Sequence, residues 1–316
     1  MVAKITIDLE AVIIAVTQDV PRVLTVNPPS NEKNPALPSG LLDPISDATL
    51  EKALRAWVTR QTGLGIGYVE QLYTFGDRAR DPRERDISRE RHISVAYLAL
   101  TRETRPAATL PAAWRNIYHF LPWENWHVGR PGLIDEHVLP GLNSWLEQRV
   151  TLARKHEQSQ RIQTCFAPNG GTWDVEACLD RYELLFEAGL IAESPDADEP
   201  IPGCGLAMQQ DHRRILATAL GRLRGKIRYR PVVFELLDAE FTLSQLQGVV
   251  EALAGSRLHK QNFRRLVARA GLVESTGKAD HSNPGRPAGL FRFRREVFRE
   301  RPAPGLRFSG AQHVGG

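Results

Sequence analysis

The sequence has 316 residues, of which 42% are hydrophobic and 25% charged, and its formal net charge is +4. This composition is that of an ordinary water-soluble protein. No run of about eighteen apolar residues occurs, which excludes a membrane-spanning helix, and Asp8 and Glu10 lie where a signal peptide would be apolar. The three cysteines, Cys165, Cys178 and Cys204, are widely spaced, so we expect reduced thiols, no disulfide framework and a cytoplasmic protein.

The first third of the chain predicts strands around one helix. Residues 9–16, LEAVIIAV, are almost continuously apolar and predict a buried strand, and residues 22–26 predict a second. Apolar residues recur at helical spacing from Thr49 onward, and Gly63 ends the pattern. Residues 69–76 and 93–100 predict two further strands.

The loop and helix that end at Gly63 resemble the Nudix box, in which glutamates hold magnesium against a diphosphate. With Gly40 as the first glycine and two extra residues in the loop, the four glutamate positions fall on Ala48, Trp57, Arg60 and Gln61. Magnesium requires hard oxygen ligands, and this set offers one neutral amide oxygen. We therefore predict no metal site and no Nudix hydrolysis.

Arg60 places a fixed positive charge where the metal would otherwise neutralise a diphosphate. We hypothesise that Arg60 faces the phosphates of a ligand. An alternative, at least as well supported by the sequence, is that Arg60 pairs with Glu51 or a loop acid on the surface.

Residues 123–208 are expected to form a helical insertion, with one helix over residues 134–150 and another capped by Thr172. Its Trp123, Trp126 and Trp145 are predicted to be core residues. Dimerisation and remodelling of a ligand site are both open as its role.

The last third predicts a winged helix-turn-helix. Thr242 and Gln245 have the spacing of a capping box, and Gly255 and Ser256 form a short turn before a second helix. That second helix, within residues 258–272, is apolar on one side and basic on the other. Residues 272–274 and 277–294 predict a wing.

Charge is divided unevenly between the two parts of the chain. Residues 212–301 contain 19 Lys and Arg against 8 Asp and Glu, whereas residues 1–211 contain 21 against 29. The net charge is therefore +11 in the later segment and −8 in the earlier one. Such asymmetry is expected when one domain contacts phosphate and the other does not.

Several short motifs resemble the NrtR family of Nudix-related transcriptional regulators: YTFG at 73–76, RDPR at 80–83, SVAYLAL at 94–100, NFRR at 262–265 and GRP at 285–287. In that family a Nudix-like domain senses ADP-ribose or a related nucleotide, and a C-terminal winged helix binds operator DNA. The resemblance covers roughly residues 1–120 and 211–298 and is more specific in the second region.

The resemblance implies a two-domain α/β (α+β) fold. A Nudix-like mixed sheet flanked by helices, with a helical insertion, precedes a winged helix-turn-helix. We divide the chain into a Nudix-like domain, the insertion, a linker helix, the DNA-binding domain and a flexible tail, at residues 1–122, 123–208, 209–224, 225–301 and 302–316.

The candidate DNA-binding residues are polar or cationic positions of the recognition helix and wing: Lys260, Gln261, Asn262, Arg264, Arg265, Arg269, Arg286, Arg292 and Arg294. Following the resemblance, the candidate ligand-binding residues are Arg60, Phe75, Arg80 and Tyr97. Arg80 would meet a diphosphate, and the two aromatic rings would stack on adenine. The alternative for Phe75 and Tyr97 is that they are core residues.

Together these features predict a homodimeric DNA-binding repressor of NAD-related genes. It would bind double-stranded operator DNA and ADP-ribose or a related nucleotide, need no cofactor and not contact a membrane. Two alternatives stay open. One is a Nudix hydrolase that uses Asp43, Asp47 or Glu51, and the other is a winged helix that binds protein or RNA.

Overall fold

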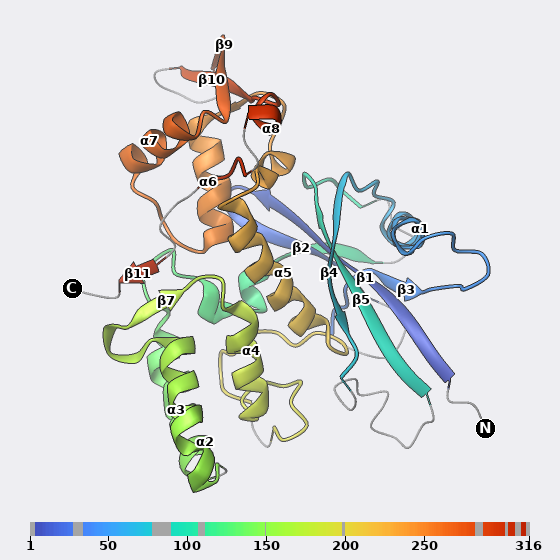
Figure 1. The fold of residues 1–316 in the computed structure, drawn as a ribbon, viewed down its shortest axis with the longest axis vertical. Helices are drawn as coiled ribbons and strands as arrows, with labels where there is room; N and C mark the ends of the chain where they lie inside the picture. The colour runs from blue at the N-terminus through green and yellow to red at the C-terminus, as the bar shows by residue number, and fades with distance from the viewer. Residues whose placement is uncertain are drawn as a thin grey trace.

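The protein is described from a computed structural model covering residues 4–27, 34–77, 90–106, 111–148, 150–197, 200–281, 287–300, 303–306 and 311–313. A β-sheet lies on one side of the molecule, a helical region on the other, and helix α5 (His212–Ile227) runs between them (Figure 1). The winged helix-turn-helix stands at one end of α5. The α/β fold class predicted from the sequence is confirmed.

The main sheet is mixed and has six strands. They are β1 (Lys4–Thr17), β2 (Val20–Val26), β3 (Ser39–Leu41), β4 (Tyr68–Phe75), β5 (Glu90–Leu100) and β6 (Ala112–Asn116). The order is β4-β5-β1-β2-β6, and β3 pairs with β1. Strands β1 and β5 are parallel, with Leu9 opposite Val95, and the other pairs are antiparallel. The four strands predicted from apolar runs are confirmed.

Strand β1 is buried on both faces, which explains its continuous apolar sequence. Leu9, Ala11 and Ile13 pack with helix α1 (Leu50–Thr62). Val12 and Ile14 lie on the opposite face, in the larger core shared with α5 and the rest of the molecule. The predicted end of α1 is also confirmed, because Gly63 adopts a left-handed conformation. Thr49, where the helical spacing was predicted to begin, caps the helix by accepting from the Lys52 amide.

The insertion is helical but differs in detail from the expectation. After the 3-10 turns Ile117–His119 and Pro122–Glu124 come a π-helical turn (Ile134–Val138), α2 (Leu139–Gln148), α3 (Leu152–Phe166), a 3-10 turn (Pro168–Gly170), β7 (Thr172–Asp174) and α4 (Cys178–Glu187). The predicted helix cap at Thr172 is wrong. Thr172 pairs with His313 in a short ladder, and α4 begins only after the turn from Asp174 to Ala177.

The insertion shares one hydrophobic core with the rest of the protein. Trp123 and Trp126 are buried as predicted, and the half-buried Trp145 packs against the same core. Part of the expected flexible tail is structured as well. Leu306 is buried, its amide donates to the Ile227 carbonyl, and β11 (Ala311–His313) pairs with β7.

The winged helix comprises a 3-10 turn (Val232–Leu236), β8 (Phe241–Thr242), α6 (Leu243–Ala254), α7 (Lys260–Ala270), β9 (Val273–Asp280), β10 (Ala288–Phe293) and α8 (Val297–Glu300). Strands β8, β10 and β9 form the second sheet in that order. The capping box is present: Thr242 and Gln245 each accept a hydrogen bond from the other's amide. Among the described residues, no helix is long and apolar enough to cross a bilayer.

Candidate nucleic-acid interface and box helix

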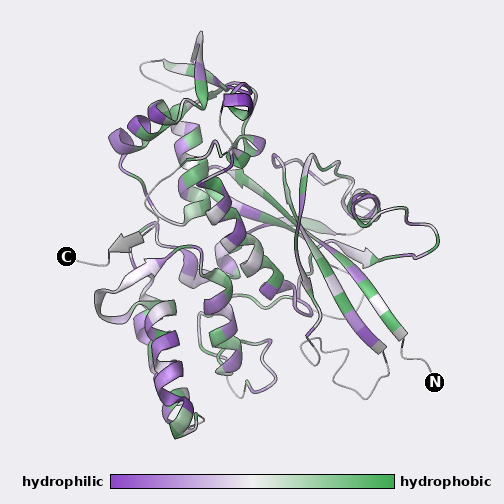
Figure 2. Cartoon of the chain, viewed as in Figure 1, coloured by the Kyte–Doolittle hydropathy of each residue, from purple (hydrophilic) through white to green (hydrophobic). Residues whose placement is uncertain are grey.

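Helix α7 separates apolar from cationic residues as its sequence predicts. Phe263 and Val267 are buried against the winged-helix core. The opposite face carries six exposed polar or cationic side chains, Lys260, Gln261, Asn262, Arg264, Arg265 and Arg269, and the helix is largely hydrophilic in Figure 2. Within the described part of the chain, no carboxylate pairs with any of its four cations. This face can therefore receive an anionic partner without first breaking an ion pair.

The turn before α7 is fixed by α6. Gln247 Nε2 donates to the Leu258 carbonyl at 2.9 Å, and the Leu258 amide donates to Glu251 Oε1 at 2.7 Å. Gly255 ends α6 with φ of 72°. These contacts hold the start of α7 against α6, so the two helices form one rigid unit.

The wing arginines are engaged in contacts of their own. Arg292 pairs with Glu274, which lies opposite it in the β9–β10 ladder. Arg294 lies just past β10, where it donates to the Gly271 carbonyl at 2.9 Å and pairs with Glu300 at 2.6 Å. A cation at the carbonyl end of α7 stabilises that helix. Arg286 lies outside the described residues.

Two side chains at the Nudix-box glutamate positions of α1, Trp57 and Gln61, make hydrogen bonds to the neighbouring strand β3. Gln61 accepts from the Ser39 amide at 3.1 Å and donates to the Ser39 carbonyl at 2.7 Å. Trp57 Nε1 donates to the Leu41 carbonyl at 3.0 Å, and the Arg60 guanidinium lies 4.5 Å from the centre of the Trp57 ring. The one amide oxygen at the box positions is thus already used. Among the described residues, no group of three His, Cys, Asp or Glu could hold a metal ion.

The carboxylates considered for the hydrolase alternative have local partners. Asp43 accepts from the Ile45 amide and the Ser46 hydroxyl, and the Ser46 hydroxyl is the main cause of its lowered pKa. Asp47 accepts from the Asp43 amide at 2.8 Å. Glu51 pairs with Arg55 at 2.9 Å. These contacts build the turn before α1 and its first helical turn.

Gly40 gives a test of the contact between α1 and β3. A Cβ at Gly40 would lie 2.5 Å from Trp57 Cγ, too close for any side chain while the indole stays in place. We expect Gly40→Ala to lower the free energy of unfolding by about 1–3 kcal/mol, as overpacking does. Urea denaturation measures this change.

The matched control for Gly40→Ala is the same substitution combined with Trp57→Ala. Removal of the indole relieves the overlap, so Gly40→Ala should cost much less in that background. Equal costs in the two backgrounds would contradict the close contact.

The two aromatic residues expected to stack on a ligand lie on opposite faces of the main sheet. Phe75 is 5% exposed in the larger core, with the Arg214 guanidinium 5.1 Å from its ring centre. Tyr97 is equally buried on the α1 face, and burial raises its pKa. Arg80 lies outside the described residues. The structure therefore does not bring the two predicted rings together, and the alternative that they are core residues agrees with their burial.

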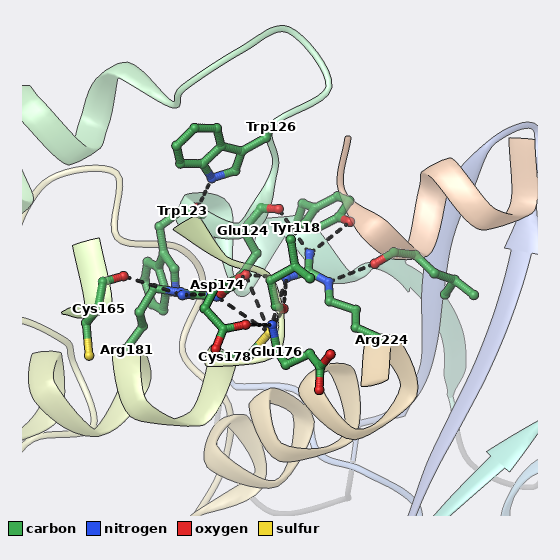
Figure 3. Close-up of polar contacts among 12 residues, drawn as sticks. Tyr118, Trp123, Glu124, Trp126, Cys165, Asp174, Glu176, Cys178, Arg181 and Arg224 are labelled. Carbon is green, nitrogen blue, oxygen red and sulfur yellow. Dashed lines mark hydrogen bonds and ion pairs between the residues drawn. The ribbon is translucent and has the colours of Figure 1, made fainter. Parts of the chain in front are cut away.

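Sequence reasoning missed a buried charged cluster. Glu124, Arg181 and Arg224 are each at most 1% exposed, and the Glu124 carboxylate is shared by both guanidinium groups (Figure 3). Burial alone would raise the pKa of Glu124, but the two arginines outweigh it and lower that pKa below its ordinary value of 4.5. The sequence gives only a weak indication of this cluster, because Arg181 and Arg224 are single arginines among apolar residues of their helices.

Comparison with known proteins agrees with this architecture. Residues 233–293 match the family model described as the NrtR DNA-binding winged helix domain. The chain is also 25% identical over 258 residues to the ADPR responsive transcriptional repressor NtrR of Acinetobacter baylyi, covering 82% of this chain and 69% of that protein. The chain is thus similar to Nudix-related regulators of the NrtR family, most specifically over its winged helix domain.

Solved structures support the NrtR-type fold over nearly the whole chain. Shewanella oneidensis NrtR, crystallised with a 27mer DNA, matches with a TM-score of 0.57 and 20% identity, covering 95% of this chain and 98% of that one. A MutT/nudix family protein from Enterococcus faecalis matches with a TM-score of 0.56 and 18% identity, covering 93% and 88%. The resemblance to the NrtR family that the sequence predicted is confirmed.

Proposed function

We propose that the protein is a transcriptional repressor that binds operator DNA through α7 and responds to ADP-ribose or a closely related nucleotide. The observation that carries this proposal is the exposed face of α7, whose cations have no acidic partner among the described residues, within an NrtR-type winged helix. A recognition helix of this kind enters the major groove with its N-terminal residues leading. Lys260, Gln261, Asn262 and Arg264 are therefore assigned to base edges, and Arg265 and Arg269 to phosphates.

The Nudix-like domain is assigned a sensing role without catalysis. Its box helix offers no carboxylate at the box positions, and Trp57 and Gln61 hold β3. The Acinetobacter baylyi relative is named for its response to ADPR, which supports ADP-ribose as the effector. The proposal needs no metal or other cofactor.

The proposal includes a cytoplasmic homodimer acting on NAD-related genes. Two winged helices related by a twofold axis would match an approximately palindromic operator. ADP-ribose can change DNA affinity only if it binds the DNA-competent arrangement with a different affinity from the alternative.

The test is fluorescence anisotropy on duplex DNA from the gene's own upstream region, at fixed salt with non-specific competitor, titrated with ADP-ribose. We expect specific binding whose midpoint shifts with ADP-ribose. Incubation with ADP-ribose and magnesium should release no AMP. Metal-dependent release of AMP would instead favour the hydrolase, and equal affinity for duplex RNA would favour the RNA-binding alternative.

We propose that Arg60 meets the nucleotide's phosphates. It is exposed on α1, and its guanidinium lies over the Trp57 ring, at a position where the Nudix box has a glutamate. We expect Arg60→Ala to weaken ADP-ribose binding about tenfold, since hydrogen bonds to charged groups are worth about 1.5–3 kcal/mol. Isothermal titration calorimetry measures this, with Lys52→Ala on the same helix as control. Unchanged affinity would remove Arg60 from the site.

A further inference from the structure

The carbonyl end of α6 is held by groups from outside the winged helix. The Ala252 carbonyl accepts from the Tyr118 hydroxyl at 2.6 Å, and the Leu253 carbonyl accepts from Arg224 Nε at 2.9 Å. The Gly255 carbonyl accepts from the Trp126 amide at 2.7 Å. The last carbonyls of a helix have no partner within it, so they are free to make such bonds. The turn that leads into α7 is thereby attached to three other segments.

The fit at this turn is close. A Cβ at Gly255 would lie 2.8 Å from Arg224 Nη2 and 2.9 Å from the Tyr118 hydroxyl. Figure 3 shows Tyr118 and Arg224 next to one another on the side of the cluster that faces α6. Only glycine, which has no side chain, fits at position 255 of this turn.

Arg224 is itself fixed by the insertion. Its Nη1 pairs with Glu124 and donates to the Val175 carbonyl at 3.0 Å, while Nη2 donates to the Glu124 carbonyl at 3.1 Å. Arg181 pairs with the same carboxylate at 2.6 Å and donates to the Asp174 carbonyl at 2.8 Å. The hydrogen-bond partners of Arg181 all belong to the insertion. Of these two arginines, only Arg224 bonds both to the insertion and to α6.

We propose that Arg224 is a positioning residue for the recognition helix, and that the insertion acts through Glu124 as a rigid brace that sets the orientation of α7. This inference rests on the proposed DNA-binding function. Because α6 and α7 form one unit, fixing the end of α6 fixes α7. In a dimer, the two recognition helices must match half-sites about one or more helical turns apart, so their orientation determines which spacing is bound.

Arg224→Lys tests the proposal against Arg181→Lys as a matched control. Lysine keeps the positive charge beside Glu124 but lacks the planar fork that bonds the Leu253 carbonyl and Glu124 at once. Both substitutions disturb the same buried cluster, but only Arg224→Lys removes a bond to α6, the one from Arg224 Nε to the Leu253 carbonyl. We expect Arg224→Lys to lower operator affinity at least tenfold and to flatten the preference among operators of different half-site spacing. Arg181→Lys should change affinity less than about twofold, and both variants should keep the wild-type affinity for ADP-ribose.

A second measurement needs no DNA. Spin labels at Lys52→Cys on α1 and Ala268→Cys on α7 report the distance between the sheet and the recognition helix. The native thiols are buried, and burial raises the pKa of Cys178 to about 12, so labelling is confined to the introduced cysteines. We expect one narrow distance distribution in the wild type and in Arg181→Lys, and a broad one in Arg224→Lys.

If Arg224→Lys does not fold, Tyr118→Phe replaces it, since that change removes the hydroxyl that donates to the Ala252 carbonyl and accepts from Arg224 Nη2. It should broaden the distribution to a smaller extent. Failure of the wild type to bind any operator would overturn the proposed function, while the label distances would still test the brace. A narrow distance distribution in Arg224→Lys, or in Tyr118→Phe where that variant replaces it, would overturn the brace. Equal effects of Arg224→Lys and Arg181→Lys on operator affinity would overturn it as well.

Discussion

Replacing Arg264 and Arg265 together with alanine is expected to weaken specific operator binding by at least about 30-fold. Arg264 is assigned to a base edge, a contact worth about 1–3 kcal/mol, and Arg265 to a phosphate, a hydrogen bond between charged groups worth about 1.5–3 kcal/mol. The loss of both contacts therefore costs about 2 kcal/mol or more. Both side chains are exposed and have no acidic partner among the described residues. The free energy of unfolding should therefore stay within about 0.5 kcal/mol of the wild-type value.

Anisotropy titrations of this double variant at several salt concentrations separate the two kinds of contact. The slope of log K against log salt should become shallower by about 0.9 for each phosphate contact removed. A contact with a base edge lowers the affinity for the operator more than the affinity for a scrambled duplex. The same comparison of the two duplexes with each single variant, Arg264→Ala and Arg265→Ala, assigns each arginine to a base or to a phosphate.

The control removes the same net charge elsewhere. Lys52 on α1 and Arg154 on α3 are exposed, and both lie outside the winged helix. The double variant Lys52→Ala with Arg154→Ala should bind DNA like the wild type. If both double variants lose affinity equally, binding depends on total charge, and α7 is not the recognition surface.

The parts of the fold that could be predicted from sequence are those whose cause is local. The capping box at Thr242, the left-handed Gly271 and the apolar spacing of Phe263 and Val267 all act within a few residues. The two faces of α7 follow from that spacing alone, so the basic surface could be predicted from the sequence. The same holds for α1, with its caps at Thr49 and Gly63.

Phe75 and Tyr97 lie on opposite faces of the sheet for a reason that alternation along a strand cannot reveal. Phe75 and Tyr97 lie on adjacent paired strands, but a register shift between Gln71 and Tyr73 interrupts the β4–β5 ladder. One shifted residue exchanges the two faces of a strand. Without the register, no sequence argument can decide whether two aromatic residues share a face.

The buried cluster was beyond prediction because its members are distant in sequence. Glu124 is 57 positions from Arg181 and 100 from Arg224. A helical arginine is usually a surface residue, and burial is expected only when a partner is known. The insertion consequently carried no sign that it contacts the helix-turn-helix.

Glu124→Ala is expected to destabilise the protein by about 3–5 kcal/mol, because it leaves two buried guanidinium groups without their carboxylate. The exposed pair between Arg161 and Glu187 provides the control, joining α3 and α4 within the same insertion at 2.6 Å. Glu187→Ala should cost about 1 kcal/mol or less, since an exposed ion pair gains little over its hydrated ions. Urea denaturation followed by tryptophan fluorescence measures both, because Trp123 and Trp173 lie in the same core. Equal costs for the two variants would contradict the special importance of the buried cluster.

The pH dependence of the stability difference between the wild type and Glu124→Ala tests whether the ionised Glu124 carboxylate causes that difference. The pKa of Glu124 is lower in the folded protein than its ordinary value of 4.5, so its ionised form is favoured by folding. Its contribution to stability is therefore complete above the unfolded pKa and is lost as the pH falls through the lower folded pKa. The difference in stability between wild type and Glu124→Ala should stay constant from neutral pH down to about 5 and should narrow only below the ordinary glutamate pKa. A difference that already narrows near pH 6 would mean that a histidine, such as the half-buried His127, controls this region instead.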